Sequence, residues 1–375
     1  MRTTPPFRAD HVGSLLRPPA LLRARDQHAA GQITAEQLRA VEDDAITDVV
    51  AMQRNVGLQS ATDGEFRRAS WHMDFIYQIG GIEKAPGNLA VKFYNPAGKI
   101  EFTPAALHIG SKLHMAKTIF GDDFAFLQSR TGAAGSGGVT PKLTIPSPNM
   151  VHYRGGPAAI DPAVYPDIEQ FWHDLAAAYA DEVARLAALG CSYLQFDDTS
   201  LAYLNDPGQR AQIAARGEDV EHLHLRYIRN VNAALAGKPA GLTVTTHLCR
   251  GNFRSSWAAS GGYDFVAEGL FGELAVDGFF LEYDDERSGS FAPLRFVPPG
   301  KLVVLGLVTT KSGVLENPGD IKRRIEQAAA YVPLEQLCLS PQCGFSSTVE
   351  GNTLSYQQQV AKLELIVKVA GEVWG

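Results

Sequence analysis

Short apolar segments alternate with longer amphipathic segments along most of the chain. Helices are expected from about Thr34, where Thr-Ala-Glu-Gln resembles a capping box, to Asn55, and again over 165–189 and 355–373. The strand-like apolar runs lie at 9–15, 59–62, 142–145, 193–196, 242–246, 278–281, 302–307 and 336–339. Strands that alternate with helices are typical of βαβ units and of a parallel sheet.

These strand-like runs number eight, and the third and the eighth carry the weakest pattern. Eight parallel strands joined by helices predict an α/β fold, a single (β/α)8 barrel of the TIM type over residues 1–375. A doubly wound open sheet is the alternative, but no Gly-rich dinucleotide-binding fingerprint follows an early strand. The sequence contains no short repeat and no linker that would separate two domains.

The alternation breaks after the second expected strand. Residues 75–138 are rich in Gly, Pro and aromatic side chains, with a hairpin-like turn at 95–98 and a Gly-rich run at 132–138. We interpret this segment as an inserted lobe over the mouth of the barrel, with the Gly-rich run as its hinge.

Composition and charge narrow the class of protein. The 375 residues are 45% hydrophobic and 20% charged, enough for a large core, and the net charge of −7 argues against binding nucleic acid through a basic surface. No apolar run reaches the roughly 18 residues of a membrane span, and the first residues lack the apolar core of an export signal. Four cysteines do not make a disulfide framework in a chain of this length, so we expect a cytoplasmic protein. A homo-oligomer is left open.

The strongest chemical signal is the segment 246–250, Thr-His-Leu-Cys-Arg, at the end of an expected strand. Side chains two positions apart on a strand face the same side, so His247 and Cys249 can converge on one ion. Cys343 follows another expected strand in Ser-Pro-Gln-Cys-Gly, and Glu282 ends the strand between them. One imidazole, two thiolates and one carboxylate match the ligand preference of zinc. A packed His–Cys pair without metal is the alternative.

The remaining cysteines, Cys191 and Cys338, begin and lie within expected strands. Both are interpreted as small buried apolar residues, since free cysteine is among the most buried residue types.

Acidic side chains also lie at strand ends. Asp197 and Asp198 could form an acid/base pair, a metal site or a clamp for an ammonium group. Adjacent strand residues point to opposite faces, so one should enter the barrel mouth while the other caps the next helix. The apolar pattern does not decide which. Glu65, after the second strand, is a further candidate, with a surface ion pair to Arg67 or Arg68 as its alternative.

Together these residues resemble the catalytic half of cobalamin-independent methionine synthase and, more closely, its short single-barrel relatives. The segment 246–253, Thr-His-Leu-Cys-Arg-Gly-Asn-Phe, resembles the zinc motif of that family, and 340–344 resembles the segment of its last zinc cysteine. The His-Val-Gly-Ser segment at 11–14 resembles the opening loop, where the backbone and a serine hold the carboxylate of homocysteine. The resemblance implies substrate-binding roles for Val12, Gly13 and Ser14.

The same resemblance extends to the acidic positions. It implies that Glu282 is a zinc ligand and that Glu65 and Asp197 receive the amino group of homocysteine.

Three departures from the pattern of the family are evident. The second, N-terminal barrel of the full-length enzyme is not expected here, and the acidic motif of the fourth strand has Asp-Asp-Thr in place of Asp-Glu-Pro. The catalytic histidine after the seventh strand is replaced by Val-Thr-Thr-Lys-Ser at 308–312, which brings Lys311 to that place.

The sequence therefore predicts a zinc-dependent thiol alkyltransferase that acts on small molecules. Methyl transfer to homocysteine from a folate or another methyl carrier is the first interpretation, with Asp197 and Lys311 as catalytic candidates. Lys311 would polarise the leaving group or anchor an anionic donor, unless it only pairs with Glu316.

Three alternatives stay open. The same zinc could serve another electrophile, such as an epoxide opened by the thiol coenzyme M, as in some short relatives of the family. A metal-free barrel like uroporphyrinogen decarboxylase would grip acidic substrates with arginines, and a non-enzymatic zinc scaffold would need no further polar residues at strand ends.

Overall fold

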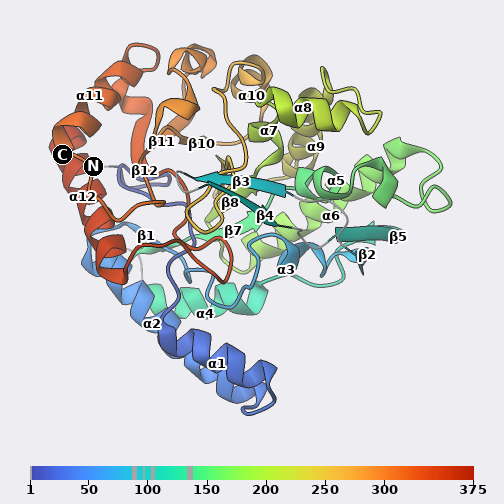
Figure 1. The fold of residues 1–375 in the computed structure, drawn as a ribbon, viewed down its shortest axis with the longest axis horizontal. Helices are drawn as coiled ribbons and strands as arrows, with labels where there is room; N and C mark the ends of the chain where they lie inside the picture. The colour runs from blue at the N-terminus through green and yellow to red at the C-terminus, as the bar shows by residue number, and fades with distance from the viewer. Residues whose placement is uncertain (1, 87–90, 96–97, 103–105, 133–137) are drawn as a thin grey trace.

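The computed structural model describes residues 2–86, 91–95, 98–102, 106–132 and 138–375 (Figure 1). Its centre is a six-stranded parallel sheet in the order β12-β11-β10-β9-β8-β7. These strands are β7 (Leu143–Pro146), β8 (Tyr193–Asp198), β9 (Thr243–Leu248), β10 (Gly278–Glu282), β11 (Leu302–Val308) and β12 (Leu337–Pro341). The shorter strands are β1 (Ser60–Ala61), β2 (Gly80–Ala85), β3 (Val91–Asn95), β4 (Gly98–Phe102), β5 (Ala106–His114) and β6 (Thr140–Pro141).

Helices follow the strands in sequence and surround them (Figure 1). They are α1 (Pro19–Ala29), α2 (Ala35–Asn55), α3 (Met73–Ile76), α4 (Gly121–Thr131), α5 (Asn149–Gly155), α6 (Ile168–Ala188), α7 (Ser200–Tyr203), α8 (Pro207–Ala214), α9 (Leu223–Leu235), α10 (Ala267–Glu273), α11 (Pro318–Ala329) and α12 (Tyr356–Trp374). The predicted α/β fold with a parallel sheet is confirmed.

Helix boundaries follow local capping chemistry. The predicted capping box at Thr34 is present, because its side chain accepts from the backbone N–H of Gln37 while Gln37 accepts from the N–H of Thr34. Ser355 and Gln358 cap α12 in the same way. Each pair satisfies two backbone donors that a helix start would otherwise leave open.

Both ends of the six-stranded sheet are extended by short pairings. The segment that forms β6 leads directly into β7, and β6 pairs in parallel with β1. Beyond β12, Ala9 forms a single parallel bridge with Leu339. The expected strand over 9–15 is otherwise wrong. Backbone carbonyl groups of this segment accept hydrogen bonds from side chains and not from the backbone of a neighbouring strand. Val12 O accepts from Gln195 Nε2 at 2.6 Å, and Gly13 O accepts from Thr62 Oγ1 at 2.6 Å.

The segment between β1 and β6 folds into α3, the antiparallel pair β2–β5, the hairpin β3–β4 and α4. Figure 1 shows the hairpin in front of the main sheet. It is tied to the chain after β9, because Tyr94 and Trp257 exchange backbone hydrogen bonds of 2.7 and 2.9 Å. Most of the Gly-rich run expected as a hinge, 133–137, and residues 96–97 of the expected turn lie outside the described residues.

The sheet lies within the apolar core. Every residue of β7, β8, β10, β11 and β12 is buried, as expected for parallel strands covered on both faces. A polar cluster is enclosed with them, in which Lys142 Nζ lies 3.3 Å from Asp10 Oδ1, and Tyr193 donates to Asp10 Oδ2 at 2.8 Å. Among the described residues, no helix is both long and apolar enough to span a bilayer.

A buried carboxyl group on α6 makes stability depend on pH. Glu182 is fully buried, its Oε1 accepts from the N–H of Ile119 at 2.8 Å, and burial raises its pKa from 4.5 to about 8. The folded state therefore favours the protonated form, so this contribution to stability is complete below about pH 4.5 and is lost as pH rises through 8.

We predict that Glu182→Gln stabilises the protein by roughly 2–4 kcal/mol at pH 8 and has little effect at pH 4, because the amide cannot ionise. Urea denaturation at the two pH values measures this difference. Glu326→Gln, at an exposed position on α11, is the control and should change stability by the same small amount at both. An equal effect of Glu182→Gln at pH 4 and pH 8 would contradict the argument.

Candidate active site

Four side chains of the metal-ligating types converge at the carboxyl ends of three strands. His247 lies in β9, and Cys249 directly follows that strand. Glu282 is the last residue of β10, and Cys343 lies two residues beyond β12. Their ligand atoms all lie within 4.8 Å of one another, and all four residues are buried. The two sulfurs are 3.5 Å apart and form no disulfide.

Arg250 fixes the end of β9 against the end of β10. Its backbone N–H donates to Glu282 Oε1 at 3.0 Å, and its Nη1 donates to the backbone carbonyl of Glu282 at 2.8 Å. The same Nη1 donates to the hydroxyl of Tyr263, which accepts in turn from the N–H of Glu282. The guanidinium is almost fully buried, so these bonds compensate for the loss of its hydration. Arg250 therefore has a structural role, which is to hold the ends of β9 and β10 together.

Close backbone approach joins Cys343 to the opening loop. A Cβ atom at Gly344 would lie 2.0 Å from the Ser14 Oγ, so no larger residue fits there without displacing that loop. The N–H of Phe345 donates to the carbonyl of Ser14 at 2.9 Å. Gly13 has a φ of +149°, and a Cβ there would lie 2.7 Å from Thr144 Cγ2. The predicted carboxylate-binding loop is therefore held directly beside the last cysteine.

A small cavity of about 60 Å³ opens onto this cluster, and we call it the metal-side cavity. Its lining includes most of the side chains that the sequence singled out, namely Val12, Ser14, Glu65, Asp197, His247, Cys249 and Cys343. Gly13, Glu282 and Lys311 are not part of the lining.

The structure shows which of the two adjacent aspartates faces the metal-side cavity. Asp197 lines the metal-side cavity and accepts from Gln195 Nε2 at 2.7 Å. Asp198 points away and is saturated by hydrogen bonds from Ser147, Asn149, Ser200 and the N–H of Leu201, so it caps α7. Burial raises the pKa of Asp197 to about 7, against 3.8 ordinarily.

Glu65 is also buried at the cavity. Its Oε1 accepts from Thr144 Oγ1 at 2.9 Å and lies 3.8 Å from Arg68 Nη1, while Oε2 has no hydrogen-bond partner. Burial raises its pKa. The alternative ion pair with Arg68 is therefore present, but it is buried and does not lie at the surface, since both side chains are about 3% exposed, and Arg67 pairs with other carboxylates.

Lys311 lies near the cluster but does not line the metal-side cavity. Its Nζ is 3.4 Å from Asp284 Oδ2, and its positive charge acts to lower the pKa values of Glu282 and Cys343. The alternative pairing with Glu316 is wrong, since that carboxylate lies 3.0 Å from Lys362 Nζ.

The four clustered side chains retain unused ligand capacity. Both ring nitrogens of His247 and Oε2 of Glu282 are buried without a hydrogen-bond partner. Burial raises the pKa of Glu282, whereas the hydrogen bond between the sulfurs raises the pKa of Cys249 and lowers that of Cys343. Buried polar groups are usually satisfied, so unsatisfied ligand atoms that face one another fit a bound cation.

Several cavity residues were not found by sequence reasoning. Arg154 and Tyr203 line the cavity together with Trp71 and His72, whose rings are in contact at a tilt of 34° with centroids 4.3 Å apart. They come from loops and short helices after strands, where no spacing signals a role. Asn252 could have been found, because it belongs to the motif at 246–253; its Nδ2 donates to the carbonyl of Gly344 at 2.7 Å.

Comparison with known proteins places these features in a family. Residues 149–372 match the model of the cobalamin-independent synthase catalytic domain. The chain belongs to this family, which confirms the resemblance inferred from the sequence. YxjH of Bacillus subtilis, a protein of uncharacterised function, is 48% identical over 370 residues, which are 98% of this chain and 95% of YxjH.

Two further relatives carry a functional description. A methionine synthase of Saccharolobus solfataricus is 25% identical over 362 residues, 94% of this chain and 92% of its own length. A crystal structure from Listeria monocytogenes, assigned to the vitamin-B12 independent methionine synthases, is 38% identical with a TM-score of 0.79 and covers 99% of both chains.

If the four clustered side chains share one metal ion, Cys249→Ser and Cys343→Ser should each lose most of the roughly one equivalent of zinc that the protein binds. Inductively coupled plasma mass spectrometry of the purified variants measures the loss. Cys191→Ser is the matched control, because Cys191 is a free, buried cysteine outside the cluster and its variant should keep its zinc. Full zinc retention in both cluster variants would refute the assignment.

Proposed function

We propose that this protein is a zinc-dependent thiol alkyltransferase that transfers a methyl group to homocysteine. The observation that carries the proposal is the convergence of one imidazole, two thiols and one carboxylate beside a cavity that also holds two further carboxyl groups. Membership of a family that contains methionine synthases supports methyl transfer as the reaction.

The side chains fit a zinc ion. The donor set of one nitrogen, two sulfurs and one carboxylate oxygen is a combination that zinc accepts with tetrahedral geometry. The ligand atoms already face one another, and the unpartnered nitrogens of His247 and Oε2 of Glu282 have no other described use. We therefore assign His247, Cys249, Glu282 and Cys343 as the ligands.

A free thiol with a pKa near 8.5 is mostly protonated at neutral pH and is then a weak nucleophile. When bound, zinc would lower the pKa of a coordinating thiol so that the reactive thiolate forms at neutral pH. The burial of all four ligands keeps water away from the reacting sulfur.

The remaining residues would orient an amino-acid thiol. Glu65 and Asp197 face the cavity and can accept hydrogen bonds from an ammonium group. Ser14 lines the same cavity next to Gly344, the neighbour of Cys343, and its loop offers a hydroxyl group for the carboxylate of the substrate. Asp197 has a pKa near 7, so an approaching ammonium group would favour its ionised form.

We propose an electrostatic role for Lys311. Its ammonium group does not line the metal-side cavity, so it does not touch the donor in this arrangement. It lies close enough to Glu282 and Cys343 for its positive charge to lower their pKa values and favour their anionic, metal-binding forms, while Asp284, its ion-pair partner, acts in the opposite sense on Glu282.

We further propose that the sheet closes into the single (β/α)8 barrel expected from the sequence. Three hydrogen bonds across the two outer segments support closure, from Leu15 N to Gly64 O at 3.1 Å, from Thr62 Oγ1 to Gly13 O and from Ser60 Oγ to Asp10 Oδ1 at 3.2 Å. Residues 75–138 then form an inserted lobe over the barrel mouth. Phe93 of the β3–β4 hairpin supports this place, because it lines the metal-side cavity.

A second candidate function uses the same centre with a sulfonate thiol such as coenzyme M. One observation favours it, namely that the guanidinium of Arg154 lines the metal-side cavity and could receive a sulfonate. The two buried carboxyl groups in the same cavity oppose an anionic thiol and favour an ammonium group, so we rank homocysteine first.

Asp197→Asn should weaken homocysteine binding about a hundredfold and leave zinc content unchanged, because a desolvated ammonium group loses its charged partner. Isothermal titration calorimetry of the zinc-loaded protein measures the affinity. The control is Asp181→Asn, which removes a carboxylate on the exposed face of α6 and should bind homocysteine as the unaltered protein does. Unchanged affinity in Asp197→Asn would contradict the clamp.

A thiol screen separates the two candidate functions. We expect saturable binding of homocysteine and much weaker binding of coenzyme M, since the cavity presents carboxyl groups to the part of the molecule beyond the sulfur. Titration of each thiol into the same zinc-loaded sample gives the comparison. Preferential binding of coenzyme M would move the assignment to the sulfonate thiol.

A further inference from the structure

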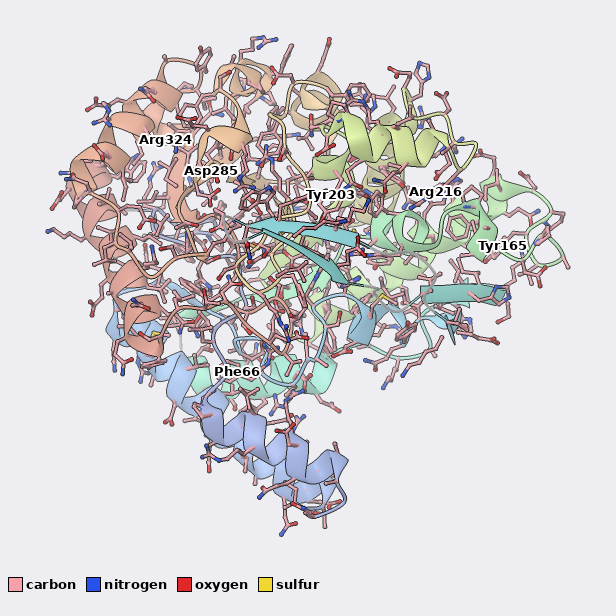
Figure 2. The ribbon with its side chains drawn as sticks, in the orientation of Figure 1. Phe66, Tyr165, Tyr203, Arg216, Asp285 and Arg324 are labelled. Atoms are coloured by element: carbon pink, nitrogen blue, oxygen red, sulfur yellow. The ribbon has the colours of Figure 1, made fainter. Side chains whose placement is uncertain are left out.

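A second cavity adjoins the metal-side cavity and has a different character. It encloses about 350 Å³ and is lined by three cationic side chains, Lys92, Arg154 and Arg216. We call it the cationic cavity. Arg154 and Tyr203 line both cavities, so the two spaces meet at these side chains. In the view of Figure 2, Tyr203 is labelled beside β3 and Arg216 beside α5.

The three cations are not held by carboxylates, and the only hydrogen bond of their side chains within the described residues is one of 3.5 Å from Arg216 Nη1 to the backbone carbonyl of Tyr153. None of them forms an ion pair within 4.0 Å of a carboxylate in the described part of the chain, and the Nε atom of Arg154 is buried without a hydrogen-bond partner. The one acidic residue in the lining, Asp206, is already engaged, because it accepts from the N–H groups of Gly208, Gln209 and Ser260. The cavity therefore presents a net positive charge.

An aromatic side chain stands where the two cavities meet, and it is suited to a flat organic group. Tyr203 is buried, and a Cβ atom at Gly251 would lie 2.7 Å from its hydroxyl oxygen, which places that hydroxyl against the segment of the zinc motif. Tyr153 packs edge-on against Tyr203, with ring centroids 5.8 Å apart, and it lines the cationic cavity together with Tyr94. On β3, alternation of side chains directs Phe93 to the metal-side cavity, while Lys92 and Tyr94 line the cationic one.

We propose that the cationic cavity is the subsite for an anionic arm of the alkyl donor, a carboxylate or phosphate group carried at some distance from the transferred carbon. The inference rests on the proposed function. Two arginines and a lysine that lack carboxylate partners form charge-assisted hydrogen bonds with such a group, and arginine matches carboxylate and phosphate geometry in a bidentate manner. The donor would then extend from the metal-side cavity past Tyr203.

Anion binding can be measured without any transfer reaction. We expect inorganic phosphate or glutarate, titrated separately into the zinc-loaded protein by calorimetry, to give saturable binding. Arg216→Gln should weaken it about tenfold or more, since a hydrogen bond to a charged group is lost. Lys92→Gln should weaken it as well, and because Lys92 is exposed its replacement does not threaten the fold. Arg23→Gln, an equal change of charge at an exposed position on α1, is the control and should bind as the unaltered protein does.

The preference between the probes identifies the donor class. Tighter binding of glutarate supports a carboxylate-bearing donor such as methyltetrahydrofolate, and tighter binding of phosphate supports a phosphodiester-bearing donor such as methylcobalamin. In either case KM for that donor should rise in Arg216→Gln with kcat little changed. Binding of neither anion, or equal binding in Arg216→Gln, Lys92→Gln and the unaltered protein, would overturn the proposal. Zinc content and thiol affinity are measured separately, so failure here is distinguishable from failure of the proposed function.

Discussion

Burial of four side chains of metal-ligating types at one point is the constraint on which the rest of this structure depends. A buried carboxyl group, an imidazole without partners and two thiols 3.5 Å apart each carry a desolvation cost when no cation is shared among them. Unsatisfied buried groups typically cost about 1–3 kcal/mol each. A bound metal ion would reverse this balance, so metal binding and local order are expected to be coupled.

The framework around the cluster restricts how far it can relax. Arg250 joins the ends of β9 and β10 through bonds to both the side chain and the backbone of Glu282. Gly344 allows the opening loop to lie against Cys343, and Gln195 donates to both the carbonyl of Val12 and the carboxylate of Asp197. The four clustered side chains, the opening loop and Asp197 are thus connected through short hydrogen bonds of the surrounding framework. A substitution in any of these supports should alter the geometry of the others.

The sequence predicted those parts of the molecule that follow from local pattern or motif spacing. The strands β7 to β12 are short segments rich in apolar, aromatic and β-branched residues, and the capping box at Thr34 is a local arrangement of two side chains. His247 and Cys249 are two positions apart on one strand, so their convergence follows from strand geometry. Which of Asp197 and Asp198 faces the cavity could not be predicted. Both faces of β8 are buried, so the strand lacks the alternation of apolar and polar residues that would identify its inner face.

Features that depend on tertiary contacts between distant loops were not predictable in the same way. The expected strand over 9–15 is reduced to one bridge because side chains from other strands satisfy its carbonyls. The cationic cavity brings together Lys92 and Arg216, which are far apart in sequence and belong to no motif. Lys311 pairs with Asp284 rather than with Glu316, since Lys362 of α12 already occupies that carboxylate.

The central claim is that the four buried side chains hold a zinc ion to which a substrate thiol gains access. Zinc K-edge X-ray absorption of the purified protein, recorded with and without homocysteine, tests it most directly. The account predicts two sulfur neighbours and nitrogen or oxygen neighbours for zinc in the protein alone, because Cys249 and Cys343 are the only sulfur donors in the described cluster. It predicts one additional sulfur neighbour when homocysteine is present. A spectrum that shows fewer than two sulfur neighbours at the outset, or none gained on addition of the thiol, would contradict it.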